Sequence, residues 1–365
     1  MNPRILSTAH SKFGYLINHL PLAQQIKLIS FGRQKFMQYF VNYLQFAEFI
    51  PDESQSCQMW GINFRSLLGN AAGMFKNGEG YDVVAKLGAG AYLGGTSTYN
   101  PRVGNNKNGI KLPFISLHNS KSAVNWLGLP NLGDKVLAQR SITESKVDGC
   151  PIGWSLMRSP DFAEDDGVSK LIESLWLYHN NHQIDFIEVN ESCPNIKLGV
   201  AGIIPRLERI SNEFLLRRQR HIPVVVKLSN DLDLCNLAEI IEKLIHLGYD
   251  GINLGNTSVD YKSFMSQLAD QDRDLFSYFT ATFGGGLSGA LLKQKSLDLC
   301  AEAANQLQRL RPNHEFHIIR SGGVECAQDL LTSKQHGISF NQWYTGFFNA
   351  YTKQGSSVYQ DMYNL

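Results

Sequence analysis

The sequence predicts an α/β fold, a (β/α)₈ TIM barrel with a small helical extension at its N-terminus. Eight short runs rich in apolar and β-branched residues have the length and composition of buried strands. Helical patterns, such as those at 236–247 and 296–310, lie between most of these runs. Eight strands that alternate with helices favour a closed parallel barrel over an open sheet. The predicted strands are 66–72, 91–96, 152–156, 184–189, 224–228, 251–254, 317–321 and 340–345.

The composition fits one large barrel domain with an appendage. The chain has 365 residues, of which 43% are hydrophobic, and a formal net charge of +1 that excludes bulk electrostatic binding of nucleic acid. The six cysteines form no CxxC pair, and His118, His221 and His317 show no metal-ligand spacing. We therefore expect no metal and no disulfide framework, with reduced thiols in a cytoplasmic setting. No transmembrane helix is expected, because no apolar run reaches about 18 residues.

The N-terminal segment differs from the rest of the chain in charge. A short helix is expected at 13–20, and Pro21 can begin a second helix with large apolar side chains at 36, 39, 40, 43 and 44 along one face. A basic, aromatic, amphipathic helix is typical of a membrane interface, although packing on the barrel or a dimer contact explains the pattern equally well. We therefore divide the chain into an N-terminal helical segment at 1–52 and a barrel at 53–365. Up to Ala47 there is no acidic residue, and the basic residues are Arg4, Lys12, Lys27, Arg33 and Lys35.

A candidate reaction centre follows the strand predicted at 184–189. The segment reads Asn190-Glu191-Ser192-Cys193-Pro194-Asn195. In a (β/α)₈ barrel the active site lies at the C-terminal ends of the strands, and two amides beside a thiol there suit a planar polar substrate. Cys193 is the candidate proton acceptor. The alternative is a buried, inert cysteine, since free cysteine is often a small core hydrophobe.

Two connections stand out by their length. Residues 98–117 contain many Asn and Lys residues and are expected to form a small irregular insertion at the top of the barrel. Residues 264–282 form a long polar connection after the sixth strand. Long connections without structure of their own are usually functional, so a lid is expected there.

Three glycine-rich pieces come at or just after the late strands, at 284–289, 321–324 and 344–346. Glycine lets backbone amides approach an anion closely, and successive N–H groups form an anion-binding concavity. Loops after strands 7 and 8 of such barrels often hold a phosphate. The three pieces together favour a phosphate-bearing cofactor over simple tight turns.

Several motifs occur in an order that is more specific than any one of them. Besides the Asn190 segment and the glycine-rich pieces, they are Asn70-Ala71-Ala72-Gly73 with Lys76-Asn77-Gly78-Glu79, Gly94-Gly95-Thr96-Ser97-Thr98, Asn125-Trp126-Leu127-Gly128-Leu129-Pro130-Asn131, Val226-Lys227-Leu228 and Asn256-Thr257-Ser258. Through these motifs, from about Gly61 to Asn349, the chain resembles the dihydroorotate dehydrogenases, FMN flavoenzymes of pyrimidine synthesis.

The chain mixes traits of two classes in this family. Its helical extension and the Ala71-to-Glu79 region resemble the membrane-bound, quinone-reducing class. Its 125–131 piece and its Ser-Cys-Pro-Asn loop resemble the soluble class, since the quinone class normally has Ser where this chain has Cys193. Phe75 stands where an Asp is usual, and Lys111 replaces an Arg near the quinone site. These departures concern the electron acceptor more than the flavin or the fold.

The resemblance implies oxidation of dihydroorotate to orotate. A base takes a proton from C5 while a hydride passes from C6 to the flavin N5, and the cofactor carries the redox step. Cys193 would be that base. A free thiol has a pKa of about 8.5, so its action near neutral pH needs a cationic neighbourhood, which Lys76 and Lys227 are candidates to provide.

The resemblance also implies the binding residues, among which Lys76 would reach both substrate and flavin. Lys227 would lie near the flavin N1. The residues implied for the substrate are Lys76, Asn125, Leu127, Gly128, Leu129, Asn190, Asn195, Asn256 and Thr257. Those implied for FMN are Ala72, Gly73, Lys76, Thr96, Ser155, Asn190, Lys227, Gly286, Gly322, Gly323, Tyr344 and Thr345.

A membrane quinone is the expected electron acceptor, entering between the N-terminal helices and the flavin. The protein is then expected in the cytoplasm, peripheral on the inner face of a membrane. Two alternatives stay open: the same oxidation with a soluble acceptor such as fumarate, and a flavin-barrel relative without dehydrogenase activity that serves as a binding or regulatory protein. The oligomeric state is left open.

Overall fold

The structure contains the predicted barrel. In this computed structural model, which describes residues 3–5, 17–191 and 200–364, eight parallel strands are hydrogen-bonded in the order β3-β15-β14-β12-β11-β10-β9-β4. All eight predicted strands are confirmed: four have the predicted ends, and the other four have ends displaced by one or two residues. They are β3 (Leu68–Asn70), β4 (Tyr92–Ser97), β9 (Ile152–Leu156), β10 (Phe186–Asn190), β11 (Val224–Leu228), β12 (Gly251–Leu254), β14 (His317–Ser321) and β15 (Phe340–Trp343).

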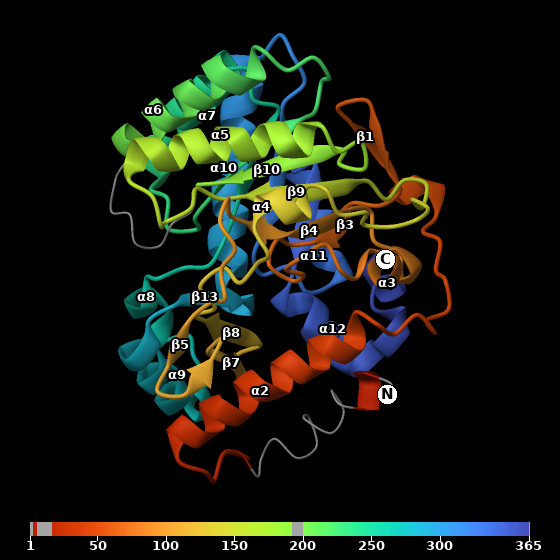
Figure 1. Ribbon diagram of the computed structural model, residues 1–365. Helices are drawn as coiled ribbons and strands as arrows, with labels where there is room; N and C mark the ends of the chain where they lie inside the picture. Colours follow the sequence, from red (N-terminus) through yellow and green to blue (C-terminus); the bar gives the residue numbers. More distant parts are fainter. Residues whose placement is uncertain (1–2, 6–16, 192–199, 365) are drawn as a thin grey trace.

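Helices cover the outside of the barrel (Figure 1). Alternate strand residues such as Ile187, Val189 and Val226 are fully buried in one large core with these helices. The helices expected at 236–247 and 296–310 are confirmed as α7 (Leu237–His246) and α10 (Lys293–Leu310). The others are α3 (Tyr81–Leu87), α4 (Asp134–Leu137), α5 (Glu164–His179), α6 (Val200–Ile210), α11 (Ala327–Gln335), α12 (Thr345–Gln354) and α13 (Gln360–Tyr363), with short turns η1 (Glu53–Gln55), η2 (Ser211–Leu215), η3 (Leu234–Asn236), η4 (Ala290–Leu292) and η5 (Gly355–Ser357).

A side chain closes one seam of the barrel. Between β3 and β4, the Asn70 Nδ2 donates to the Leu93 carbonyl at 2.8 Å and the Asn70 Oδ1 accepts from the Leu93 N–H at 3.1 Å. A backbone hydrogen bond from the Gly90 N–H to the Leu68 carbonyl, 2.8 Å long, joins β3 to the segment that directly precedes β4. Because Asn70 is the last residue of β3, the loop that follows this strand leaves the barrel beside the seam.

A β-hairpin closes the N-terminal end of the barrel. Strand β1 (Cys57–Met59) pairs with β2 (Ile62–Phe64), and Trp60 at its turn packs in one apolar cluster with the inward residues Phe186 and Phe340. This apolar floor fills the lower barrel. Access for a ligand is therefore left to the opposite end, where the C-termini of the strands lie.

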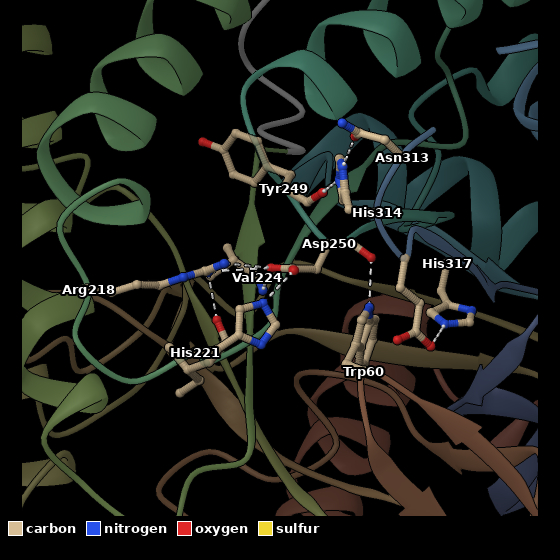
Figure 2. Close-up of polar contacts among 11 residues, drawn as sticks. Trp60, Arg218, His221, Val224, Tyr249, Asp250, Asn313, His314 and His317 are labelled. Atoms are coloured by element: carbon tan, nitrogen blue, oxygen red, sulfur yellow. Dashed lines mark hydrogen bonds and ion pairs between the residues drawn. The ribbon is translucent and has the colours of Figure 1, made fainter. Parts of the chain in front are cut away.

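Asp250, which directly precedes β12, ties the hairpin to the barrel. Figure 2 shows the Trp60 Nε1 donating to the Asp250 carbonyl, at 2.8 Å. The buried Asp250 carboxylate accepts from the Val224 N–H at 2.8 Å and lies 3.4 Å from Arg218 and 3.0 Å from His221. A carboxylate with this many partners is a structural anchor, and its position at the lower end of the barrel indicates a role in stability rather than chemistry.

A small antiparallel sheet, with strand order β13-β8-β7, lies on the side of the barrel where the C-termini of its strands lie. Its strands are β7 (Phe114–Leu117), β8 (Ser122–Asn125) and β13 (Gly286–Gly289), and a hairpin of β5 (Asn106–Lys107) and β6 (Ile110–Lys111) precedes them. The insertion expected at 98–117 is thus partly regular structure. The glycine-rich piece at 284–289 belongs to this sheet and not to the end of a barrel strand, which corrects its expected position.

The structureless lid expected at 264–282 is wrong. Those residues form the end of α8 (Tyr261–Met265) and most of α9 (Asp270–Phe283). Phe276, Phe279 and Leu275 of α9 are buried in a second hydrophobic core together with Val124 of the small sheet. The polar composition that suggested a loop belongs to the solvent face of an amphipathic helix.

The N-terminal helix α2 (Leu22–Phe40) packs on both parts of the molecule. Figure 1 shows α2 running from α9 to α12. Ser30 Oγ donates to the Phe114 carbonyl at 3.1 Å and accepts from the Phe114 N–H at 3.0 Å, so α2 is fixed to β7. The apolar face expected from 36 to 44 is wrong at its end, because the helix stops at Phe40, before Tyr43 and Leu44. Most of the helix expected at 13–20 lies outside the described residues.

The two sides of α2 have different surroundings. Phe40 is fully buried, with ring centroids 5.6 Å from Phe347 and 5.3 Å from Tyr351. Leu28 and Phe31, in contrast, are 47% and 58% exposed. Across residues 3–5, 17–191 and 200–364, no helix combines the length and hydrophobicity needed to span a membrane.

Replacing Asn70 by Ala should open the side-chain seam and destabilise the barrel. Leu93 would lose partners for its buried N–H and carbonyl, so we expect the free energy of unfolding to fall by about 2–4 kcal/mol. Urea unfolding followed by tryptophan fluorescence measures this. Asn63→Ala, at an exposed position of β2, is the matched control and should change stability by less than about 0.5 kcal/mol. Equal stability of the two variants would show that the seam does not depend on the amide.

Candidate active site

A polar layer crosses the barrel above its apolar floor. Lys227 of β11 and Glu188 of β10, 3% and 1% exposed, lie with Nζ and Oε1 3.4 Å apart. The Glu188 Oε2 accepts from Asn253 at 2.6 Å and from Gln342 at 3.1 Å. The Gln342 Oε1 accepts from Lys227 at 3.2 Å and from Ser321 at 2.9 Å. A buried ammonium is costly unless it is paired and hydrogen-bonded, and four other strands supply these partners.

This layer retains acceptor atoms without donors. Among the described residues, neither the Glu188 Oε1 nor the Asn253 Oδ1 has a hydrogen-bond donor, although both are buried. Buried polar atoms in proteins are nearly always hydrogen-bonded. The layer therefore fits a site that a polar, planar ligand completes from above.

Lys76 lies on the loop that follows β3. Glu79 fixes this loop by accepting the N–H groups of Lys76, at 3.0 Å, and of Asn77, at 2.6 Å. Gly95 of β4 allows the loop to come close, since a Cβ there would lie 2.8 Å from the Lys76 carbonyl oxygen. A Cβ at Gly73 would lie 3.6 Å from the Lys76 Nζ, so these two predicted site residues are neighbours.

The surroundings of Lys76 disfavour its charge. Burial, supported by the Arg33 guanidinium and opposed by the Glu79 carboxylate, lowers the pKa of Lys76 to about 7. A lysine that titrates near neutrality can gain its proton when an anion binds beside it. Phe75, in contrast, points into the core, where it is fully buried with its ring centroid 5.4 Å from that of Tyr92.

Three of the four predicted substrate amides are joined through a chain of contacts. Asn190 ends β10, and its Oδ1 lies 3.4 Å from the Asn256 Nδ2. Thr257 follows Asn256, and a Cβ at Gly286 would lie 2.0 Å from the Thr257 Oγ1. Asn125 ends β8, where its Nδ2 is 3.5 Å from the Gly286 carbonyl. Asn125 is therefore a strand residue of the small sheet, not a turn residue.

Other predicted residues also lie around this end of the barrel. Thr96 of β4 and Ser155 of β9 are buried neighbours, with their hydroxyl oxygens 3.2 Å apart. Ala72 is partly buried beside the apolar floor. Gly128 and Leu129, with φ of 73° and 55°, have left-handed backbone conformations after Leu127. The Leu127 carbonyl accepts from the Asn105 N–H at 2.8 Å, which holds this segment in place.

Cys193 and Asn195 lie outside the described residues, but the strand end before them is firmly held. The buried Glu191 carboxylate accepts from the Arg206 Nη2 at 2.7 Å and Nε at 3.1 Å. Arg206 also donates to Glu164 of α5 at 2.8 Å. Burial raises the pKa of Glu191. These contacts turn Glu191 toward the helices, so it is an anchor of β10.

A cavity of about 980 Å³ connects the late glycine turns with α2. Tyr344, Thr345, Gly346 and Lys293 form part of its wall, and the side chains of α2 form another part. Helix α12 begins at Thr345 without a side-chain cap, so its first backbone N–H groups suit a phosphate, while the Lys293 ammonium lies 3.1 Å from Asp329 and 3.5 Å from Glu325. Gly322 and Gly323, with φ of 118° and 71°, form the neighbouring turn. The groups that suit a phosphate and the polar layer together fit FMN.

Arg33 of α2 places a cation on the wall of this cavity. It donates to the Tyr344 hydroxyl from Nη2 at 2.6 Å and from Nε at 3.1 Å, and its guanidinium lies 5.2 Å from the Phe114 ring centroid. Lys111 was the cation expected near an acceptor site. It is exposed and does not line the cavity, and its carbonyl accepts from Gln34 at 3.1 Å. Arg33 of α2, and not Lys111 of the insertion, therefore faces this cavity together with Tyr344.

Sequence reasoning missed Glu188, Asn253 and Gln342, and gave Arg33 no position in the site. Glu188 carried a signal, because it is an acidic residue between the apolar Ile187 and Val189 in the middle of a strand. Arg33 carried none, since its partner Tyr344 is 311 residues away in the chain.

Comparison with known proteins gives a consistent result. The family model described as dihydroorotate dehydrogenase matches residues 54–363. A protein of Buchnera aphidicola named dihydroorotate dehydrogenase (quinone) is 28% identical over 313 residues, which cover 82% of this chain and 84% of that protein. One of the same name from Kineococcus radiotolerans is 29% identical over 308 residues, covering 81% and 78%.

A solved structure has the same fold. The crystal structure of DHODH from Eimeria tenella in complex with ferulenol superposes with a TM-score of 0.72 at 21% identity, covering 92% of this chain and 89% of that one. Its ligand-free form gives the same TM-score at 20% identity.

Proposed function

The chain belongs to the dihydroorotate dehydrogenase family, and from this premise we propose that it is an FMN-dependent enzyme of pyrimidine synthesis. It oxidises dihydroorotate to orotate and passes the electrons to a membrane quinone. The observation that carries the choice of acceptor is the cavity of about 980 Å³ between the glycine turns and α2. The names of the relatives from Buchnera and Kineococcus support the same choice.

The residues of the chain position the substrate and move its proton. FMN, when bound, supplies the redox chemistry. Cys193, by resemblance, takes the proton from C5 of dihydroorotate as a thiolate. Asn125, Asn190, Asn195 and Asn256 offer amide donors and acceptors to the edges of the planar ring. Protonated Lys76 compensates the charge of the bound anion, and Lys227 supplies a fixed positive charge beneath the ring.

The acceptor site combines a polar end with apolar walls. The Arg33 guanidinium and the Tyr344 hydroxyl, 2.6 Å apart, can donate hydrogen bonds to a quinone oxygen. Phe36 and Phe348 line the same cavity and suit the apolar part of a quinone.

Residues 1–52 are proposed as the segment that docks on the membrane and admits the quinone. Leu28, Phe31 and Tyr39 of α2 are exposed, and all three line the cavity. Lys27 and Lys35 lie on the same helix. Apolar groups flanked by lysines suit the inner, anionic face of a membrane, so the enzyme is placed as a peripheral protein on the cytoplasmic side.

Cys193→Ala is expected to stop the reduction of FMN by dihydroorotate while leaving FMN bound. A positioned base contributes about 10²–10⁴-fold in rate, so the loss should be of that size. Cys193→Ser should keep part of the rate, with its pH optimum moved upward because a hydroxyl is harder to deprotonate. Anaerobic bleaching of the yellow absorbance measures both. Normal bleaching of the Ala variant would assign the base elsewhere, and a wild-type protein that binds no FMN would contradict the enzymatic proposal.

Orotate affinity should depend on pH through Lys76. Its pKa of about 7 means that the ammonium is largely lost above pH 7 in the absence of the anion. Binding of orotate favours the protonated form and takes up a proton, so affinity should fall by up to about tenfold per pH unit above pH 7. Calorimetry in buffers of different ionisation enthalpy measures the proton uptake. Lys76→Gln should remove this dependence and Lys111→Gln should retain it; a flat profile in the wild type refutes the assignment.

Arg33→Ala is expected to slow the transfer of electrons to quinone and leave the reduction of FMN by dihydroorotate within about twofold. Because the acceptor loses a charged hydrogen-bond donor, the rate at which quinone reoxidises the cofactor should fall about 10-fold or more. Stopped-flow measurements separate the two half-reactions. Gln24→Ala, at an exposed position of the same helix but outside the cavity, is the control.

The same assay compares a short-chain quinone, fumarate and NAD as acceptors. Faster reoxidation by fumarate, unaffected by Arg33→Ala, would favour the soluble-acceptor alternative. A yellow protein that dihydroorotate fails to bleach would favour the binding or regulatory alternative.

A further inference from the structure

Glu188 places a negative charge in the middle of the barrel, beneath the proposed flavin site. It precedes Asn190 by two residues on β10, so both side chains face the interior of the barrel. Its Oε2 is fully engaged by Asn253 and Gln342. Its Oε1 faces the Lys227 ammonium at 3.4 Å and has no hydrogen-bond donor among the described residues. The function proposed above uses Lys227 but gives this carboxylate no part.

The charge of Glu188 opposes that of Lys227 where a flavin would experience both. Two-electron reduction adds negative charge to the flavin ring, which a nearby cation stabilises and a nearby anion destabilises. In a buried, low-dielectric layer these effects are larger than in water. An ammonium without its carboxylate would favour the reduced cofactor strongly, and the electrons would then leave for the acceptor less readily.

We propose that Glu188 is a positioning residue that acts through Lys227 to set the reduction potential of the bound FMN. The carboxylate holds the ammonium in the barrel and offsets its charge, so the cofactor is reduced by the substrate and still gives up its electrons. This inference rests on the proposed function, because it requires FMN to bind above the polar layer.

Glu188→Gln tests the inference, since Gln has nearly the same shape and its carbonyl oxygen can keep the contacts with Asn253 and Gln342. Redox titration of the FMN-loaded protein against reference dyes should show a more positive potential. We expect at least a tenfold change in the equilibrium between oxidised and reduced FMN, about 30 mV for a two-electron couple. Lys227→Gln should move the potential in the opposite direction. The double variant should return toward the wild-type value.

Glu239→Gln is the matched control, because it removes the same kind of carboxylate from an exposed position of α7, outside the polar layer. Its potential should stay near that of the wild type. Glu188→Asp keeps the carboxylate but draws it away from Lys227, so it should shift the potential in the same direction as Glu188→Gln by a smaller amount. It carries the test if the Gln variant fails to fold or to retain FMN.

An unchanged or more negative potential in the Glu188 variant that retains FMN would overturn the inference and leave Glu188 a purely structural role. A wild-type protein that binds no FMN would instead refute the proposed function. Thermal unfolding of each loaded variant, recorded in parallel, separates lost stability from a shifted potential.

Discussion

Burying the Lys227 ammonium inside the barrel determines which polar side chains four other strands must place at their inward positions. Lys227 needs compensation in a region closed to water, and it receives it from Glu188, Asn253, Gln342 and, through Gln342, Ser321. These side chains can meet only because each occupies an inward position at the same height of its strand. The hairpin around Trp60 seals the apolar floor beneath them, which excludes water and strengthens every interaction in the layer. The polar layer under the candidate active site is thus the same set of contacts that allows Lys227 to be buried.

The cavity beside α2 results from the way this helix joins two separate cores. Phe40 packs with the aromatic residues of α12 on the barrel, and Ile26 enters the core of the small sheet. The space left between these attachments carries the Arg33 and Tyr344 pair. The same helix, α2, therefore carries the exposed apolar side chains, the Arg33 guanidinium in the cavity wall and the side chains that pack on the barrel.

The sequence predicted the barrel well, because strands buried on both faces leave continuous apolar runs. It also selected residues that the fold places side by side, such as Thr96 with Ser155 and Gly73 with Lys76. It failed where partners are distant in the chain. Asn125 and Gly286 are 161 residues apart, so nothing local marked the glycine-rich piece as a strand of the small sheet. The polar face of α9 was mistaken for a loop for the same reason, since its partners lie in that sheet.

The burial of Ile26 bears on how the N-terminal segment can be studied. This side chain is fully enclosed by residues of the small sheet and α9, and Ser30 is bonded twice to β7. Truncation of the first fifty residues would strip the lining from that core and favour aggregation. A shortened protein that lost activity would then report misfolding instead of impaired docking. Point substitutions on the outer surface of the helix are the sound route to separate the two.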